Sequence, residues 1–287
     1  MSPQGKLIII GGAEDKGTFS EPTFIQKNNL NFFSLGILKK ILVEINNNNP
    51  SIEVITTASI IPEEVGEMYI SAFSQIGATN VKYLDIRSRE DVNNPEFIAR
   101  VTKADAVLFS GGNQLRLSSI LGGTQVHDII LKRYREEEGF VIAGTSAGAA
   151  ACSNTMIYEG SSSEALLKGS VKITTGLGFI NDVIIDSHFV KRGRFGRLFA
   201  AIASNPGVLG IGLGEDTGLL ITEGKNMEAV GSGLVVFVDG RHILSTNVYE
   251  IPDGSPISVE NLIVHVLAKG NGFDLTTRKM QVQANHA

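Results

Sequence analysis

The segment Gly144-Thr145-Ser146-Ala147-Gly148 has the spacing of a hydrolase nucleophile. In the pattern G-x-S-x-G, the flanking glycines permit a strained turn between a strand and a helix, which exposes the serine hydroxyl. An apolar run precedes this segment and the small residues Ala149 to Ala151 follow it, so a strand and a closely packed helix are expected on its two sides. The alternative is that Ser146 only caps the start of that helix. The position after a strand favours Ser146 as a nucleophile.

A serine nucleophile needs a general base and an acidic group that orients this base. Among the five histidines, His188 stands out because it directly follows a strand-like run, Val183 to Asp186, and has polar neighbours. The candidate carboxylates are Glu215 and Asp216, which follow the run Val208 to Leu213, and Glu159 and Glu164, which lie in a serine-rich loop. His188 is therefore the predicted base, with the carboxylate open among four residues.

Acyl transfer also needs two donors for the developing oxyanion, usually backbone N–H groups. Ala147, at the start of the helix after the serine, is the predicted first donor. Gly112, in the glycine loop that follows another strand, is the predicted second donor because backbone can approach closely there.

Basic residues are concentrated just after His188. Lys191, Arg192, Arg194 and Arg197 open a helix in a chain that is otherwise acidic. A solvated helix face is one interpretation. However, cations at a helix N-terminus oppose the helix dipole unless an anion binds there, and guanidinium groups suit carboxylates. The pattern favours a ligand rich in carboxylates, with Asp186 available for a cationic group of the same ligand.

These residues fall at the ends of strands in a pattern typical of an α/β fold. Short β-branched runs alternate with helical periods through about residue 150, which predicts a doubly wound, mostly parallel sheet with helices on both faces. The expected strands are Lys6 to Ile10, Ile52 to Thr56, Val81 to Leu84, Ala106 to Ser110 and Phe140 to Gly144. The expected helices are Asn31 to Ile45, Pro62 to Ile76, Pro95 to Lys103 and Thr124 to Glu138. Ligands of such sheets bind beyond the carboxyl ends of the strands.

The second half of the chain contains further strand-like runs separated by glycines. Some are expected to extend the sheet, and the glycines at 231, 233 and 240 predict hairpins or a meander attached to the same core. No linker is evident, so residues 1–287 are expected to form a single α/β domain with a C-terminal β extension.

Composition excludes several classes of protein. The net charge of −5 argues against the basic field that nucleic-acid binding requires. No apolar stretch approaches the roughly 20 residues of a membrane-spanning helix. The single cysteine, Cys152, cannot form an internal disulfide, which fits a cytoplasmic protein. Neither an H-E-x-x-H pair nor a cysteine cluster is present, so no metal or other cofactor is expected.

Several segments together resemble the cyanophycinase family. They are the serine turn Gly144 to Ala150, the loop Gly111 to Gln114, the run Asp186 to Phe189 and the motif Arg192-x-Arg194-x-x-Arg197, and Ile9 to Asp15 and Gly214 to Thr217 are also similar. The resemblance covers most of the chain. It implies a flavodoxin-like fold similar to that of class I glutamine amidotransferases, a homodimer, and a serine peptidase. Members of the family release β-aspartyl-arginine dipeptides from the end of cyanophycin, a polymer with an aspartate backbone and arginine on each side-chain carboxylate.

The resemblance also implies roles for individual residues. Carried over by motif, the catalytic residues are Ser146, His188 and Glu215. The residues implied for the substrate pocket are Gln114, Asp186, Ser187, Arg192, Arg194 and Arg197. Ser187 departs from the family pattern, because familiar members often carry glutamine between the aspartate and the histidine, and the shorter side chain is expected to alter contacts with the substrate.

Three other functions are compatible with parts of the sequence. An aspartyl dipeptidase shares the expected fold and serine turn, but it gives no reason for the arginines after His188. A glutamine amidotransferase needs a cysteine nucleophile at the turn, whereas Cys152 lies six residues beyond Ser146. A polyanion-binding protein with an inactive site is the alternative that involves no catalysis.

Overall fold

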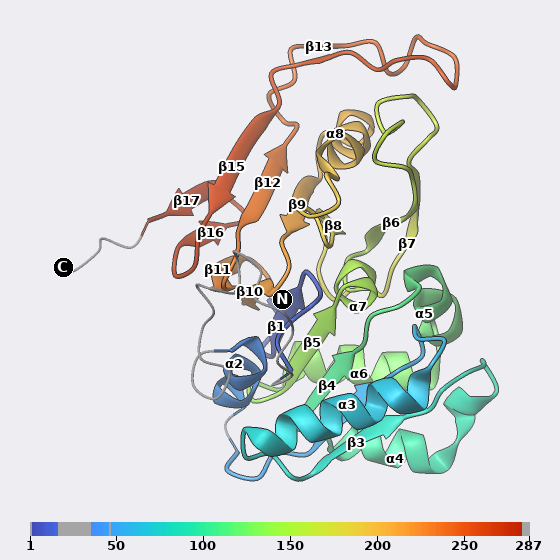
Figure 1. The fold of residues 1–287 in the computed structure, drawn as a ribbon, viewed down its shortest axis with the longest axis vertical. Coiled ribbons are helices and arrows are strands. Elements are labelled where there is room, and N and C mark those ends of the chain that lie inside the picture. The colour runs from blue at the N-terminus through green and yellow to red at the C-terminus, as the bar shows by residue number, and fades with distance from the viewer. Residues whose placement is uncertain (1, 17–35, 46, 283–287) are drawn as a thin grey trace.

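The computed structural model describes residues 2–16, 36–45 and 47–282. In this part of the chain, a nine-stranded mixed sheet has the strand order β17-β16-β11-β10-β1-β5-β4-β2-β3 (Figure 1). Its strands are β1 (Lys6–Ile10), β2 (Ile52–Ile55), β3 (Val81–Leu84), β4 (Ala106–Phe109), β5 (Val141–Thr145), β10 (Thr217–Thr222), β11 (Asn226–Gly231), β16 (Gly272–Asp274) and β17 (Lys279–Gln281). The five strands from β1 to β3 in this order run parallel, and β10 pairs with β1 in the antiparallel direction.

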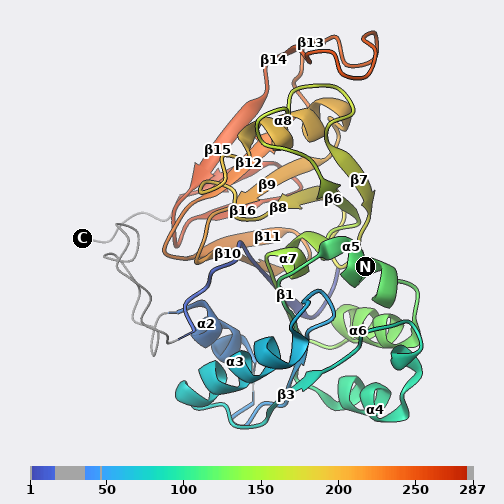
Figure 2. The same ribbon diagram turned by 45° about the vertical axis from the view of Figure 1, so that its right-hand side comes forward.

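Helices cover both faces of the parallel part of this sheet. They are α2 (Ile37–Glu44), α3 (Pro62–Gln75), α4 (Pro95–Lys103), α5 (Gln114–Leu121), α6 (Gln125–Glu136) and α7 (Ala147–Ala151), with a short 3₁₀ turn η2 (Asp91–Asn93). One more helix, α8 (Phe195–Ser204), packs against a second sheet. Alternate residues of β1 face opposite layers: Ile8 packs with α2 and α3, whereas Leu7 packs with α4, α5, α6 and α7. Figure 2 shows α2 and α3 on one side of the sheet and α4 and α6 on the other. Burial on both faces explains why these strands are continuously apolar.

A second sheet lies beside the first. Its order is β15-β12-β9-β8, formed by β8 (Val183–Asp186), β9 (Leu209–Leu213), β12 (Val235–Asp239) and β15 (Ile263–Leu267). The two sheets share one buried cluster, in which Phe237 of β12 stacks on Phe273 of β16 with ring centroids 4.1 Å apart. Helix α8 covers the other face through Leu198 and Ile202. Two hairpins complete the fold, β6 (Thr155–Glu159) with β7 (Lys172–Thr175) and β13 (Ser245–Thr246) with β14 (Val259–Glu260).

The doubly wound architecture predicted from the sequence is confirmed, and two details differ. Of the strand-like runs in the second half, β10 and β11 extend the main sheet, but β8, β9 and β12 form the separate one. Hydrophobic periodicity identifies a strand without showing which neighbour it pairs with. Helix α5 was not predicted. The expected helix from residue 31 is described from Ile37, and residues 31–35 lie outside the described part of the chain. The single-domain assignment stays a prediction.

Candidate active site

Ser146 occupies a strained turn between β5 and α7. Its backbone has φ 50° and ψ −108°, in the positive-φ region that residues with a side chain rarely adopt. The helix that follows packs tightly behind this turn, since a Cβ added to Gly148 would lie 2.2 Å from the carbonyl oxygen of Phe109 in β4. The side chain of Ser146 does not cap α7. The geometry is therefore that of a nucleophile elbow rather than of a helix cap.

His188 and Glu215 meet Ser146 from the second sheet. The Oγ of Ser146 lies 2.9 Å from Nε2 of His188, and Nδ1 of His188 lies 3.0 Å from Oε1 of Glu215. Both side chains are mostly buried, with 17% and 21% of their surface exposed. When Nδ1–H donates to the carboxylate, Nε2 is left as the acceptor for the serine hydroxyl. Three segments distant in sequence thus form a continuous Ser-His-Glu hydrogen-bonded chain at the carboxyl ends of β5, β8 and β9.

The other candidate carboxylates point elsewhere. Oδ2 of Asp216 accepts a hydrogen bond of 2.7 Å from the Ser232 hydroxyl, and burial raises the pKa of the Asp216 carboxyl. Glu159 pairs with Lys172 on the surface, and Glu164 is exposed. Among the four carboxylates considered from the sequence, Glu215 is the one that contacts His188.

A lysine that the sequence interpretation left unassigned also reaches Glu215. The Nζ of Lys191 lies 3.1 Å from Oε2, the carboxylate oxygen that His188 does not use. Its side chain is 71% exposed. Lys191 lies three residues after His188, and this spacing is the signal in the sequence that would have placed both side chains on one turn.

Of the two predicted oxyanion donors, Ala147 is next to the nucleophile, and Gly112 is one residue away from Gly111, which contacts it. Ala147 directly follows Ser146 and is the first residue of α7. Gly112 has φ +140° and lies in the loop after β4, and its neighbour Gly111 is close enough that an added Cβ would sit 3.4 Å from Cβ of Ser146. The roles of the Gly112 and Ala147 N–H groups as oxyanion donors stay a prediction.

The predicted pocket residues fall into two groups. Asp186 and Arg197 are buried and paired: both carboxylate oxygens of Asp186 accept from the Arg197 guanidinium, and Nη1 of Arg194 donates to Oδ1 over 3.0 Å. Asp186 is thus the anion that pairs with these two arginines at the start of α8. The expectation was that Asp186 is available to bind a cationic group of the ligand.

The remaining pocket residues are less constrained. Arg192 is exposed, Ser187 is buried, and Nε2 of Gln114 donates over 3.0 Å to the carbonyl of Ile157. Contacts of these six residues with a substrate stay a prediction.

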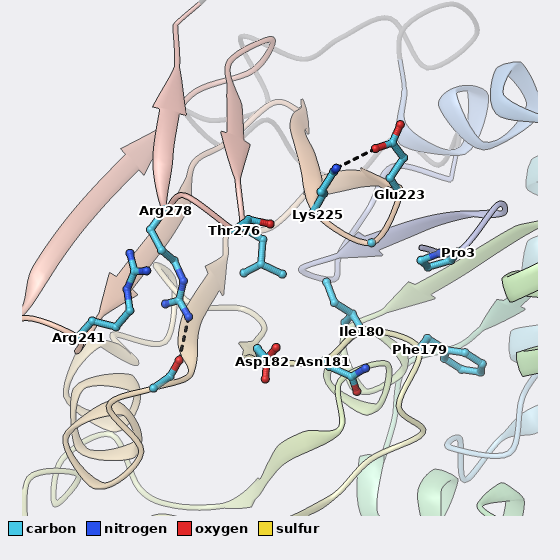
Figure 3. Close-up of a pocket in the computed structure, with 13 residues that line it drawn as sticks. Pro3, Phe179, Ile180, Asn181, Asp182, Glu223, Lys225, Arg241, Thr276 and Arg278 are labelled. Carbon is cyan, nitrogen blue, oxygen red and sulfur yellow. Dashed lines mark hydrogen bonds and ion pairs between the residues drawn. The ribbon is translucent and has the colours of Figure 1, made fainter. Parts of the chain in front are cut away.

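A separate cavity of about 530 Å³ lies away from this site (Figure 3). Its lining includes Pro3, Asp182 and Gly207, which precede β1, β8 and β9, so it opens at the amino ends of these strands. The side chains of Arg241 and Arg278 project into it, and both pair with Asp239. None of the Ser-His-Glu residues lines this cavity.

Cys152 should not react with thiol reagents in the folded protein. It is fully buried at the end of α7, and burial raises the pKa of its thiol far above the usual value. Intact mass spectrometry after treatment with iodoacetamide should show no adduct on the native protein and one adduct after unfolding in guanidinium. An adduct on the native protein would reopen the possibility of a cysteine nucleophile.

The described residues contain no group of three or more His, Cys, Asp or Glu side chains able to hold a metal ion. In the same residues, no helix is both long and apolar enough to cross a membrane.

Comparisons with known proteins identify the family. Residues 28–229 match the family model of peptidase family S51. The chain is 36% identical over 272 residues to a cyanophycinase from Trichormus variabilis, covering 95% of this chain and 86% of the relative. It is 34% identical over 276 residues to a cyanophycinase from Geminocystis herdmanii, covering 96% of each.

Solved structures share the fold at lower identity. A peptidase from an acI-B1 Actinobacterium has a TM-score of 0.63 and 22% identity, over 95% of this chain and 98% of that one. A putative peptidase E protein from Listeria monocytogenes has a TM-score of 0.51 and 19% identity, over 80% of this chain and 99% of that one. With a family match over most of its length and curated relatives above 30% identity, the chain belongs to peptidase family S51.

Proposed function

We propose that this protein is a cyanophycinase, a serine-type exopeptidase that hydrolyses cyanophycin to β-aspartyl-arginine dipeptides. The observation that carries the proposal is the Ser146-His188-Glu215 hydrogen-bonded chain in a member of peptidase family S51. The curated relatives named cyanophycinase align with nearly the whole chain, so the likeness includes the region that contains all three residues.

The proposed reaction proceeds through an acyl-enzyme. His188 accepts the proton of the Ser146 hydroxyl as Oγ attacks the carbonyl carbon of the scissile bond, which is an amide of the aspartate backbone. Glu215 holds the imidazole and stabilises its cationic form. The N–H groups of Gly112 and Ala147 receive the negative charge that develops on the carbonyl oxygen.

Collapse of the tetrahedral intermediate breaks the C–N bond, and His188 gives its proton to the leaving amine. His188 then takes a proton from water, which attacks the ester carbon and releases the second product with Ser146 reprotonated. These reaction steps use only groups of this chain, the substrate and one water molecule.

Recognition of the polymer is proposed to involve charges near the serine. Arg192 is exposed after His188, and Gln114, Asp186, Ser187, Arg194 and Arg197 complete the residues assigned to the pocket by resemblance. Since Asp186 is already paired with Arg194 and Arg197, we propose that this ion pair shapes the pocket wall, while Arg192 meets a substrate carboxylate.

The proposal extends to the state of the protein in the cell. On the resemblance to cyanophycinases, we propose a homodimer in the cytoplasm, with each chain folded as a single α/β domain. The unpaired Cys152 fits a reducing compartment.

Mass spectrometry of reaction products tests the proposed function. Wild-type protein and the Ser146→Ala variant would be incubated separately with cyanophycin and with a panel of short α-aspartyl peptides. β-Aspartyl-arginine should accumulate from cyanophycin with the wild type and not with the variant. Intact cyanophycin together with cleaved α-aspartyl peptides would instead assign the protein to the aspartyl dipeptidases, and near-normal turnover by Ser146→Ala would exclude Ser146 as the nucleophile.

A further inference from the structure

The loop that follows β1 contacts all three segments of the candidate triad. Consecutive carbonyl oxygens at the end of β1 accept backbone hydrogen bonds: Ile10 from the N–H of Ser146 over 2.9 Å, Gly11 from His188 over 2.8 Å, and Gly12 from Asp216 over 3.0 Å. The end of β1 and residues 11–16, which we call the β1 loop, therefore form a common backbone support for the nucleophile, the base and the neighbour of the acid.

The β1 loop packs against the reacting side chains without space between them. A Cβ added to Gly12 would lie 2.5 Å from Cε1 of His188 and 3.2 Å from Cβ of Ser146, and the residue has φ +100°. Only glycine fits at this position. A small displacement of the β1 loop would thus change the Ser146–His188 geometry directly.

The side chain of Glu14 links the β1 loop to the nucleophile elbow. Its carboxylate is buried, yet Oε2 accepts a hydrogen bond of 2.6 Å from Oγ1 of Thr145, the residue before Ser146. Oε1 accepts from the hydroxyl of Tyr69 and lies 2.9 Å from Nζ of Lys16. Burial alone would raise the pKa of the Glu14 carboxyl, but Lys16 and the hydrogen bonds from Thr145 and Tyr69 outweigh it and lower that pKa.

The elbow requires support from outside because little holds it locally. Ser146 is in a strained backbone conformation, its side chain makes no cap, and α7 has only five residues. Strained conformations of this kind persist only where the surrounding structure fixes them. Burial of a carboxylate is costly unless its hydrogen bonds are satisfied, so the position of Glu14 is itself a strong restraint on Thr145.

We propose that Glu14 is a positioning residue, which holds the Ser146 elbow in register with His188 through its hydrogen bond to Thr145. The inference rests on the proposed role of Ser146 as the nucleophile. Glu14 and Thr145 are both buried, and their side chains bond to each other and to Tyr69 and Lys16, so loss of their link should slow acylation without weakening the binding of substrate.

A matched pair of substitutions at Thr145 tests this proposal. Thr145→Val removes the hydroxyl and keeps the shape of the side chain, whereas Thr145→Ser keeps the hydroxyl. Thr145→Val should lower kcat by about 10- to 100-fold, since a small misplacement of a reacting group has an effect of this size. KM should stay within about twofold, as expected when only transition-state interactions are lost. Thr145→Ser should restore most of kcat.

Two further measurements separate positioning from damage to the fold. A fluorophosphonate phosphonylates Ser146, and the rate of this reaction, followed by intact mass, should fall in parallel with kcat. The fraction of protein that the probe can label counts the competent active sites, and kcat is expressed per competent site. A purely structural role would reduce the fraction of protein that can be labelled but leave kcat per competent site unchanged, and that result would overturn the proposal. Because the probe does not require cyanophycin, failure of the proposed substrate would leave the comparison of the variants intact.

The partner in the link is tested by a double substitution. If Glu14 acts through Thr145, Glu14→Gln combined with Thr145→Val should phosphonylate no more slowly than the slower of the two single variants. Losses that multiply would show that Glu14 does not act through Thr145. The Thr145 pair carries the test if Glu14→Gln does not fold.

Discussion

Substitution of His188 by alanine should lower kcat for cyanophycin on the order of 10⁶-fold, the size of loss seen when a residue is removed from a Ser-His-acid triad. The imidazole lies 2.9 Å from the Ser146 hydroxyl, and in the described residues no other histidine contacts this serine. Without it, the serine proton has no acceptor and the leaving amine has no proton donor. Detection of dipeptide by mass spectrometry over extended incubations gives the range needed to measure such a loss.

The control for this prediction is the double variant Ser146→Ala/His188→Ala. Residues that act as one unit show losses that do not add, so the double variant should be no slower than either single variant. Glu215→Gln should be less severe, at about 10⁴-fold, because it removes an orienting group rather than the base. If the losses of the double variant multiplied, Ser146 and His188 would be acting in separate steps, which would contradict the proposed mechanism.

Asp186→Asn should destabilise the protein by about 3–5 kcal/mol, the usual cost of removing one partner of a buried ion pair. The side chains of Asp186 and Arg197 are 2% and 7% exposed, and the substitution leaves the Arg197 cation buried without its counterion. Arg194 loses its ion-pair partner in the same step and keeps its hydrogen bond to the carbonyl of Ser187. Urea unfolding followed by circular dichroism measures the change in the free energy of unfolding.

Glu159→Gln provides a matched comparison for this substitution. Glu159 pairs with Lys172 over 3.0 Å, but both side chains are about half exposed, so the same chemical change should leave the midpoint of unfolding nearly unchanged. Equal stability of Asp186→Asn and the wild type would show that the charges of Arg194 and Arg197 are satisfied by other groups. Asp186 would then be free to contact a ligand.

The sequence predicts the candidate site well because its residues directly follow strands. Ser146, His188 and Glu215 each lie within two residues of the carboxyl end of a strand, where parallel sheets bind their ligands. The strands before His188 and Glu215 are parallel neighbours, whereas the strand before Ser146 belongs to the other sheet. The elbow spacing selects the serine, and the family resemblance selects Glu215 among four carboxylates. The hydrogen-bonded chain in the structure agrees with these choices, while their roles in catalysis stay predictions.

Other features depend on contacts that no local pattern contains. Two of the partners of Glu14, Tyr69 and Thr145, lie 55 and 131 residues away in the chain. The Asp186–Arg197 pair joins a strand to a helix across eleven residues. Because the local sequence does not show this pairing, the arginines near the start of the helix look like an exposed basic face. Strand pairing is a similar case, since apolar alternation in β9 and β10 does not show that they enter different sheets.

The division of the candidate triad between two sheets has a consequence for folding. Ser146 follows a strand of the nine-stranded sheet, whereas His188 and Glu215 follow strands of the four-stranded one, and the sheets meet through contacts such as the Phe237–Phe273 stack. Each sheet can keep its own hydrogen bonds while the contact between them is incomplete. Peptidase activity therefore requires the contact between the two sheets, and a chain in which this contact is incomplete should be inactive even with most of its secondary structure formed.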